Sequence, residues 1–431
     1  MHFHILGIAG TMTTPIALDL IRQGHLVTGS DQEKIYPPFS TTLAQHHIKI
    51  NPPFQKVDQY IVGSSYQAFD RCRQEFTKIK KNHLNYISAT NYITQKVIKI
   101  NSILIAGSYG KSTISALLTW VLIKNNFNPS YFFGAESLNK IPSLKTNHSS
   151  WSVVEADESI NGLDTQAKFL YYPIKFLILT STDWEHKDSY KTEADNLHAF
   201  QKLVKNIPSD GLLVYNQNSL SASKLAKSCS ASTISYTVNQ QFDSQLIGQH
   251  NQENISAVFT LCSSLGINDT QIISAIKSFK GLKRRLEIIP SGQKITVIDD
   301  FAQSPLRVKS VLNAIHQQFP LSKIYVYFEP HASFLQSKTG LIGFGNSFKT
   351  VTQVFLSQIK FNSNIPKQNR VTAKDYQVEI GDKLNYCPLE ENIYNNIISI
   401  LKPTDILVHF SSGGLSGINL TQKIAGFFKH K

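Results

Sequence analysis

Short apolar runs recur along the chain, and each ends at a glycine or a polar side chain. Runs of this length are typical of buried strands in parallel sheets. Residues 16–21 and 114–124 carry apolar side chains at helical spacing, which predicts helices between strands. This alternation predicts an α/β fold with open parallel sheets. The predicted strands are residues 2–8, 26–29, 60–63, 103–106, 151–155, 176–180, 295–300, 324–328 and 406–410.

The first strand, the helix after it and the second strand predict a β-α-β unit with a glycine turn. The turn reads Gly7-Ile-Ala-Gly10-Thr11, and the second strand ends at Ser30-Asp31. Such a unit binds a nucleotide diphosphate at the helix N-terminus and a ribose at the acid. Because the full G-x-G-x-x-G pattern is absent, a tight turn without a ligand remains an equal alternative.

Residues 103–113 read Ile-Leu-Ile-Ala-Gly-Ser-Tyr-Gly-Lys-Ser-Thr, an apolar run that enters a glycine loop and a helix. The N–H groups of such a loop cradle polyphosphate, the lysine neutralises it, and the first hydroxyl is a magnesium ligand. Ile105 stands where the general pattern has its first glycine, so an ordinary turn is the alternative. We expect ATP and Mg²⁺ to bind here. The predicted nucleotide-binding residues of the loop are Gly107, Ser108, Gly110, Lys111, Ser112 and Thr113.

Acidic and polar side chains follow the next two strands along the chain. Active sites of open parallel sheets lie at the carboxyl ends of their strands, so we expect these groups to meet magnesium and phosphate. Any one of them alone could be a solvated turn or a surface residue. The candidates are Glu155, Asp157 and Glu158 after one strand, and Asp183, Glu185, His186 and Asp188 after the other.

Composition narrows the class of protein. A chain of 431 residues that is 41% hydrophobic predicts two to four domains. The net charge of +13 would suit a polyanion, but the basic residues are dispersed, so we expect no nucleic-acid partner. The apolar runs are too short to span a bilayer and the start lacks the features of a signal peptide, which predicts a cytoplasmic protein without a membrane partner. Four separated cysteines fit free thiols.

Further motifs follow in a fixed order: Gly248-Gln-His-Asn251 with Asn254, Arg284-Arg285-Leu-Glu287, and Asp299-Asp300-Phe-Ala. With the loop and acids above, they resemble the Mur ligases over essentially the whole chain. The resemblance implies three domains. These are a Rossmann-like UDP-sugar-binding domain at 1–97, a central P-loop ATPase domain at 98–286, and a Rossmann-like C-terminal domain at 287–431 that binds the incoming amino acid or peptide. We expect a monomer or a weak dimer.

Within the family the chain looks most like the murein peptide ligases. The segments with this likeness are residues 4–11, 36–41, 168–172 and 412–418. Those enzymes join UDP-N-acetylmuramate to the recycled peptide L-alanyl-γ-D-glutamyl-meso-diaminopimelate through an acyl phosphate. The UDP-N-acetylmuramate:L-alanine ligases of peptidoglycan synthesis are the alternative branch.

The resemblance also implies roles for single residues. Lys111, His186 and Arg285 are the implied catalytic residues, and Ser112, Glu155 and His186 are the implied magnesium ligands. Asn251 and Asn254 match adenine contacts, Arg285 reaches the phosphates, and Asp300 matches the acid on the ribose. The implied substrate-binding residues are Gly10, Thr11, Ser30, Asp31, Ser40, Thr41 and His331.

The chain departs from the family pattern at several positions. Gln303 and Ser304 replace two histidines that usually precede the proline, and His331 replaces an arginine of the murein peptide ligases. Glu185 stands where the family has aspartate, and Ser64 follows Gly63 where asparagine is usual. A nucleotide- or UDP-sugar-binding protein without catalysis is therefore a second hypothesis, and a nucleic-acid-dependent ATPase is a third. The retained lysine and metal-ligand set argue for an enzyme.

Overall fold

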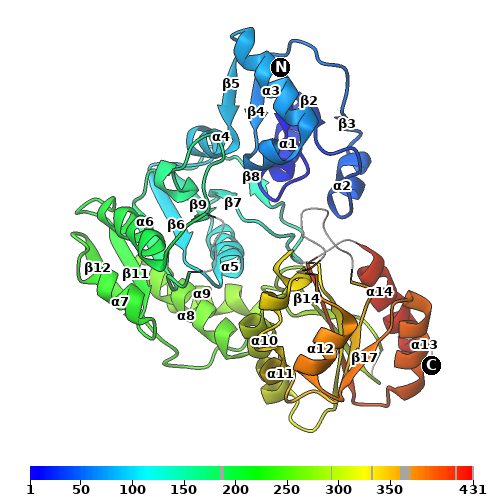
Figure 1. Ribbon diagram of the computed structural model, residues 1–431. Helices are drawn as coiled ribbons and strands as arrows, with labels where there is room; N and C mark the ends of the chain where they lie inside the picture. The colour runs from blue at the N-terminus through cyan, green and yellow to red at the C-terminus, as the bar shows by residue number, and fades with distance from the viewer. Residues whose placement is uncertain are drawn as a thin grey trace. The chain divides into compact units, whose positions relative to one another are not determined.

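The computed structural model describes residues 1–184, 189–292, 294–331, 333–359, 368, 370–412 and 415–429. These residues form three sheets and divide into two compact units (Figure 1). The first unit comprises residues 1–245 and 251–281 and contains two of the sheets. The second unit comprises residues 246–250 and 282–431 and contains the third sheet. The predicted α/β fold with three sheet-based domains is confirmed, whereas the domain borders at 97 and 286 stay predictions.

The N-terminal sheet has the order β3-β2-β1-β4-β5, and all its strands are parallel. The apolar side chains of β1 alternate between its faces. Phe3 and Ile5 pack in one cluster with α1, α2 and α4, while Leu6 packs in another with α3. The elements are β1 His2–Leu6, α1 Thr13–Arg22, β2 Leu26–Ser30, α2 Phe39–Gln45, β3 Lys49–Ile50, β4 Gln59–Val62, η1 Ser64–Ala68, α3 Asp70–Lys81, β5 Tyr86–Ser88 and α4 Ala89–Lys96.

The central sheet has the order β12-β11-β10-β6-β9-β7-β8 and is parallel except for the β7–β8 pair at its edge. Its middle strands β10, β6 and β9 carry the predicted nucleotide-site residues at their carboxyl ends. The elements are β6 Asn101–Ala106, α5 Lys111–Lys124, β7 Ser130–Phe132, β8 Leu144–Lys145, β9 Trp151–Glu155, η2 Lys168–Tyr171, β10 Phe176–Leu179, α6 Glu193–Lys205, β11 Leu212–Asn216, α7 Leu220–Ala226, β12 Ser232–Tyr236, α8 Gln249–Ser264 and α9 Asp269–Lys277.

Two features join the N-terminal and central sheets into one unit. A single apolar cluster contains Ile5 of β1 and Leu104 of β6. Polar contacts add to it, because Thr146 donates a 2.8 Å hydrogen bond to the buried carboxylate of Asp19, and Arg22 donates to the Leu144 carbonyl. Burial of shared apolar surface is the main stabilising term in such a contact.

The third sheet has the order β13-β14-β18-β15-β16-β17 and is parallel except for β13 at its edge. Helices cover both of its faces: α10, α11 and α12 pack on one, and α13 and α14 on the other (Figure 1). The elements are β13 Glu287–Ile289, β14 Thr296–Asp300, α10 Pro305–Gln318, β15 Ile324–Glu329, η3 Ser333–Gln336, η4 Lys338–Gly340, α11 Phe344–Ser347, β16 Gln353–Leu356, α12 Ala373–Ile380, β17 Leu384–Tyr386, α13 Glu390–Ile400, β18 Ile406–Ser411 and α14 Leu415–Lys429.

Candidate active site

The phosphate loop connects β6 to α5 in a conformation that only glycine accommodates. Gly107 has φ of +130°, and a Cβ there would lie 2.1 Å from Oγ1 of Thr180, at the end of β10. Gly110 has φ of +80°, and a Cβ there would lie 2.3 Å from Oδ1 of Asn254. The Thr180 hydroxyl also donates a 2.7 Å hydrogen bond to the Tyr109 carbonyl. The loop is therefore held tightly against the neighbouring strand end.

The N-terminus of α5 is suited to an anion. No side chain caps it, so its first N–H groups and the positive end of the helix dipole face the loop. Nζ of Lys111 lies in the same place and donates to the Gly107 carbonyl at 2.6 Å and to Glu158 at 2.8 Å. Backbone donors and a lysine of this kind match the predicted polyphosphate cradle.

The hydroxyl of Ser112 and the carboxylate of Glu155 meet directly. Ser112 Oγ donates to Oε1 of Glu155 at 2.8 Å, and Oε2 of Glu155 accepts from the Gly134 N–H at 2.7 Å. Two hard oxygen groups side by side, next to a phosphate cradle, fit Mg²⁺, which takes one or two protein ligands together with substrate phosphates and water. Among the described residues no group of three or more His, Cys, Asp or Glu side chains forms a metal cage. His186, the other predicted ligand, and Glu185 lie outside those residues.

A second ion pair lies beside this site and was missed from the sequence. Lys168 of η2 donates to Oδ2 of Asp157 at 2.8 Å and to Ser159 Oγ at 2.6 Å. Burial would raise the pKa of Asp157, but the charges of Lys168 and Lys111 hold it below its ordinary value. The carboxylate therefore stays ionised. No local signal in the sequence pairs residues 157 and 168, because the contact depends on the turn between them.

The two predicted adenine-contacting asparagines lie one helical turn apart on α8. Nδ2 of Asn254 donates to Oδ1 of Asn251 at 3.0 Å, and both side chains are buried. The close approach to Gly110 places Asn254 against the phosphate loop. The side chain of His250, next to Asn251, is half-buried, and desolvation lowers its pKa to about 4.

Only some of the predicted substrate-binding residues of the N-terminal domain lie close to the glycine turn. Oδ2 of Asp31 accepts from the Ala9 N–H at 2.8 Å, so this acid closes the glycine turn, and burial raises its pKa. The Ser30 hydroxyl is buried and lies 3.0 Å from Nε2 of His4. Thr11 is exposed and Gly10 is half-buried near it. On α2, Ser40 is half-buried and Thr41 is exposed.

The candidates of the second unit lie at the carboxyl ends of β14 and β15. Asp300 accepts from the N–H groups of Leu286 and Ala302, both at 2.8 Å; burial raises its pKa, and the Arg285 charge opposes this. The Arg285 guanidinium lies 5.7 Å from the centroid of the Phe301 ring.

The residues that replace the expected histidines have structural contacts. Ser304 is the N-cap of α10, with Pro305 in the first turn. Oε1 of Gln303 accepts from the His331 N–H at 3.1 Å. Gln303, which replaces one of the expected histidines, therefore links the segment after β14 to the segment after β15 within the C-terminal domain.

Comparisons with known proteins identify the class. Three family models match in order: "Mur ligase family, catalytic domain" at residues 2–95, "Mur ligase middle domain" at 105–244, and "Mur ligase, glutamate ligase domain" at 284–413. The chain belongs to the Mur ligase family and is an ATP-dependent ligase that forms C–N bonds. Among the helices in the described ranges, none is long and apolar enough to cross a bilayer.

The named relatives are of two kinds. The UDP-N-acetylmuramate–L-alanyl-γ-D-glutamyl-meso-2,6-diaminoheptandioate ligase of Haemophilus influenzae is 26% identical over 475 aligned positions, which cover 100% of both chains. The crystal structure of a UDP-N-acetylmuramate–alanine ligase from Thermotoga maritima superposes with a TM-score of 0.78 at 20% identity, over 98% of both chains. A murein peptide ligase from Psychrobacter arcticus gives 0.69 at 21% identity, over 99% of this chain and 98% of that one.

Proposed function

We propose that this enzyme joins the carboxylate of UDP-N-acetylmuramate to the amine of a small peptide, L-alanyl-γ-D-glutamyl-meso-diaminopimelate, in peptidoglycan recycling. The observation that carries the ATP-dependent step is the arrangement of Lys111 and Ser112, at the start of α5, with Glu155, at the end of β9. Full-length similarity to the H. influenzae ligase supports the peptide as acceptor. The proposed site of action is the cytoplasm.

The chemistry requires activation of the carboxylate. A carboxylate is a poor acyl donor because its leaving group would be oxide. Transfer of the γ-phosphoryl group of ATP converts it to an acyl phosphate and releases ADP. The neutral amine then attacks the carbonyl carbon, the amide bond forms, and phosphate leaves as the amine loses its proton.

Each group at the loop has a proposed part in this reaction. The N–H groups of α5 and the Lys111 ammonium bind the phosphates and neutralise their charge, which is most of what phosphoryl transfer requires. Ser112 and Glu155, with His186, would hold Mg²⁺, which supplies further charge neutralisation. Asn251 and Asn254 would contact the adenine. From the C-terminal domain, Arg285 would reach the phosphates and Asp300 the ribose.

The N-terminal domain is the proposed site of the UDP-sugar. There Gly10, Thr11 and Asp31 line the glycine turn, and Ser40 and Thr41 lie on α2. Because Asp31 already accepts the Ala9 N–H, its part is to shape the turn for the diphosphate.

Ligation of L-alanine is the second candidate function. It is favoured by full-length sequence similarity to a UDP-N-acetylmuramate–L-alanine ligase of Clostridium botulinum, which is 26% identical over 455 aligned positions, 96% of this chain and 95% of that one. The two candidates differ only in the amine, so one assay separates them.

The test is ADP release by the full-length protein with UDP-N-acetylmuramate and either L-alanine or the tripeptide. We expect turnover with the tripeptide. Turnover with alanine alone would assign the second function, and no turnover with either would favour a binding protein. Lys111→Ala should abolish ADP release and leave UDP-sugar binding intact. Lys124→Ala, on the exposed far end of the same helix, is the matched control and should remain active.

A further inference from the structure

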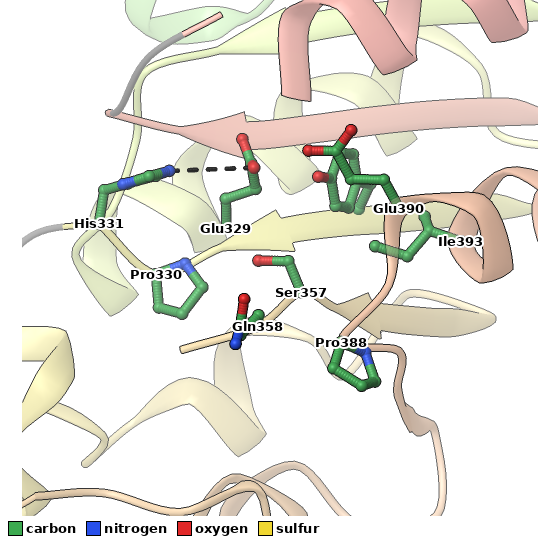
Figure 2. A pocket seen from close by; sticks show the side chains of 9 residues that line it. Glu329, Pro330, His331, Ser357, Gln358, Pro388, Glu390 and Ile393 are labelled. Atoms are coloured by element: carbon green, nitrogen blue, oxygen red, sulfur yellow. Dashed lines mark ion pairs between the residues drawn. The ribbon is translucent and has the colours of Figure 1, made fainter. Parts of the chain in front are cut away.

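A small cavity lies at the carboxyl end of β15 in the second unit (Figure 2). Its volume is about 50 Å³, several times the roughly 10–15 Å³ that one water occupies on the same scale. It therefore admits a small terminal group and not a whole peptide. Its lining residues are Tyr327, Glu329, Pro330, His331, Ser357, Gln358, Pro388, Glu390 and Ile393.

The charged groups of the lining are mainly acidic. Glu329 and Glu390 supply two carboxylates, and none of the described residues that line the cavity is lysine or arginine. His331 is the basic side chain present, and its Nε2 lies 3.9 Å from Oε1 of Glu329 (Figure 2). A ligand carboxylate would meet like charges here, whereas a cation would meet opposite ones.

A buried hydroxyl lines the same cavity. The Tyr327 side chain is fully buried. Burial, the charge of Glu329, an interaction of the phenol with that carboxylate, and then the charge of Glu390 raise the pKa of this phenol, so Oη lies close to both carboxylates. A phenol that donates to a carboxylate keeps free lone pairs on its oxygen, and a ligand with N–H donors would satisfy them.

A buried histidine, His409, fixes the position of the Glu329 carboxylate. Nε2 of His409 lies 3.0 Å from Oε2 of Glu329, and Nδ1 lies 2.8 Å from Oδ1 of Asp299. The His409 ring also stacks on Tyr327, with centroids 4.7 Å apart. Burial would raise the pKa of Glu329, but its contacts with His331 and His409 hold the pKa below its ordinary value. The cavity therefore presents a fixed, ionised carboxylate next to a phenol oxygen.

We propose that this cavity binds a primary ammonium group of the acceptor, with Glu329, Glu390 and Tyr327 as its hydrogen-bond acceptors. This proposal rests on the proposed function. It narrows the class of acceptor to peptides that carry a second amine. The attacking amine must be neutral to use its lone pair, and an anionic cavity stabilises the protonated form instead. The cavity therefore suits the distal ammonium of a diamino acid residue, which does not react.

Matched peptides test this in the wild-type enzyme. The acceptors are L-alanyl-γ-D-glutamyl peptides that end in meso-diaminopimelate or L-lysine, and their counterparts that lack only the distal amine, 2-aminopimelate and L-norleucine. We expect kcat/KM to fall by at least about tenfold when the amine is removed, since a hydrogen bond to a charged group contributes about 1.5–3 kcal/mol. Equal kcat/KM within each pair would overturn the proposal.

Variants of the lining residues test whether the cavity causes the preference for acceptors with the distal amine. Glu329→Gln should reduce the ratio of kcat/KM between the lysine and norleucine peptides to about threefold or less. Glu390→Gln tests the same point at an exposed residue and should reduce the preference in part. Glu391→Gln, exposed on the same helix turn but not in the cavity lining, should keep it. A full preference in both of the first two variants would refute the assignment.

The outcomes also separate this inference from the proposed function. Ligation of L-alanine alone, or of no acceptor, would remove the proposed function. Calorimetric binding of the lysine and norleucine peptides to the full chain would then decide the inference: tighter binding of the lysine peptide that Glu329→Gln abolishes supports it, and equal binding overturns it.

Discussion

Gly107→Ala should damage the phosphate loop through both backbone strain and a close approach. The residue has φ of +130°, which side chains with a Cβ rarely adopt. The added Cβ would lie 2.1 Å from Thr180 Oγ1 and 2.8 Å from both the N and the O of Ser181. The last two atoms belong to the backbone of the neighbouring segment, so rotation of a side chain cannot relieve them.

The magnitude follows from these two terms. A residue held in a backbone region of this kind costs about 1–3 kcal/mol. Overpacking against fixed neighbours adds about 1–3 kcal/mol. We therefore expect the free energy of unfolding to fall by roughly 2–6 kcal/mol. Thr180→Ala would remove the shortest contact but not the backbone ones, so it should restore only part of the loss.

Gly266→Ala is the matched control. Gly266 also has positive φ, +81°, but a Cβ there would meet no atom within 4 Å. Only the left-handed conformation is penalised, by about 1–2 kcal/mol. The difference between the two variants therefore isolates the close approach of the loop to the β10 end.

The assay is urea unfolding followed by tryptophan fluorescence. The tryptophans of the chain are Trp120, Trp151 and Trp184, all within the first unit, so the signal reports on the central sheet. ADP affinity, measured by calorimetry, should fall in Gly107→Ala and stay near wild type in Gly266→Ala. Equal loss of stability in both variants, with ADP binding unchanged, would refute the close approach and the predicted role of the loop.

Two further predictions concern the metal site and the buried histidine. Ser112→Ala should raise the Mg²⁺ concentration for half-maximal ADP release by about 10- to 100-fold. Ser115→Ala should not, because it removes a buried hydroxyl of the same helix that has no hydrogen bond to any described residue. An equal response in the two variants would contradict the metal assignment. His409 is buried, which lowers its pKa, but the two carboxylates beside it raise the pKa above 6.5 overall. Its charged form therefore stabilises the fold below pH 6.5, and this is lost as pH rises through the folded-state pKa, so the urea midpoint of the wild type should fall as pH rises above 6.5. His409→Gln should lack that decline, and a matching decline in the variant would show that another group causes it.

Local motifs were readable from the sequence because their structure depends on near neighbours. The run before Gly107 is a strand and the residues after Gly110 form a helix, as their apolar spacing predicts. The glycines are required by backbone geometry within a few residues. The strand that ends at Glu155 has the predicted bounds. The order of strand and helix predicted the α/β fold, and motif order, through the family resemblance, predicted its three domains.

Contacts between distant segments were not readable in the same way. Strand residues alternate between faces, and only packing decides which face meets a given helix. The hydroxyl of Ser30 could not be known to lie against His4 for that reason. The pair of Lys168 with Asp157 depends on the path of the chain after β9.

The sequence by itself determined the family, the three α/β domains and the strand, glycine turn and helix around Lys111, because each depends on short-range pattern and motif order. Only the tertiary structure decided how the cavity at the carboxyl end of β15 is built. Asp299, Glu329 and His409 lie in three strands that are far apart in the chain, and the order β14-β18-β15 brings them together. The physical reason is that a buried imidazole between two carboxylates requires pairing of those strands in one register, which no local preference sets.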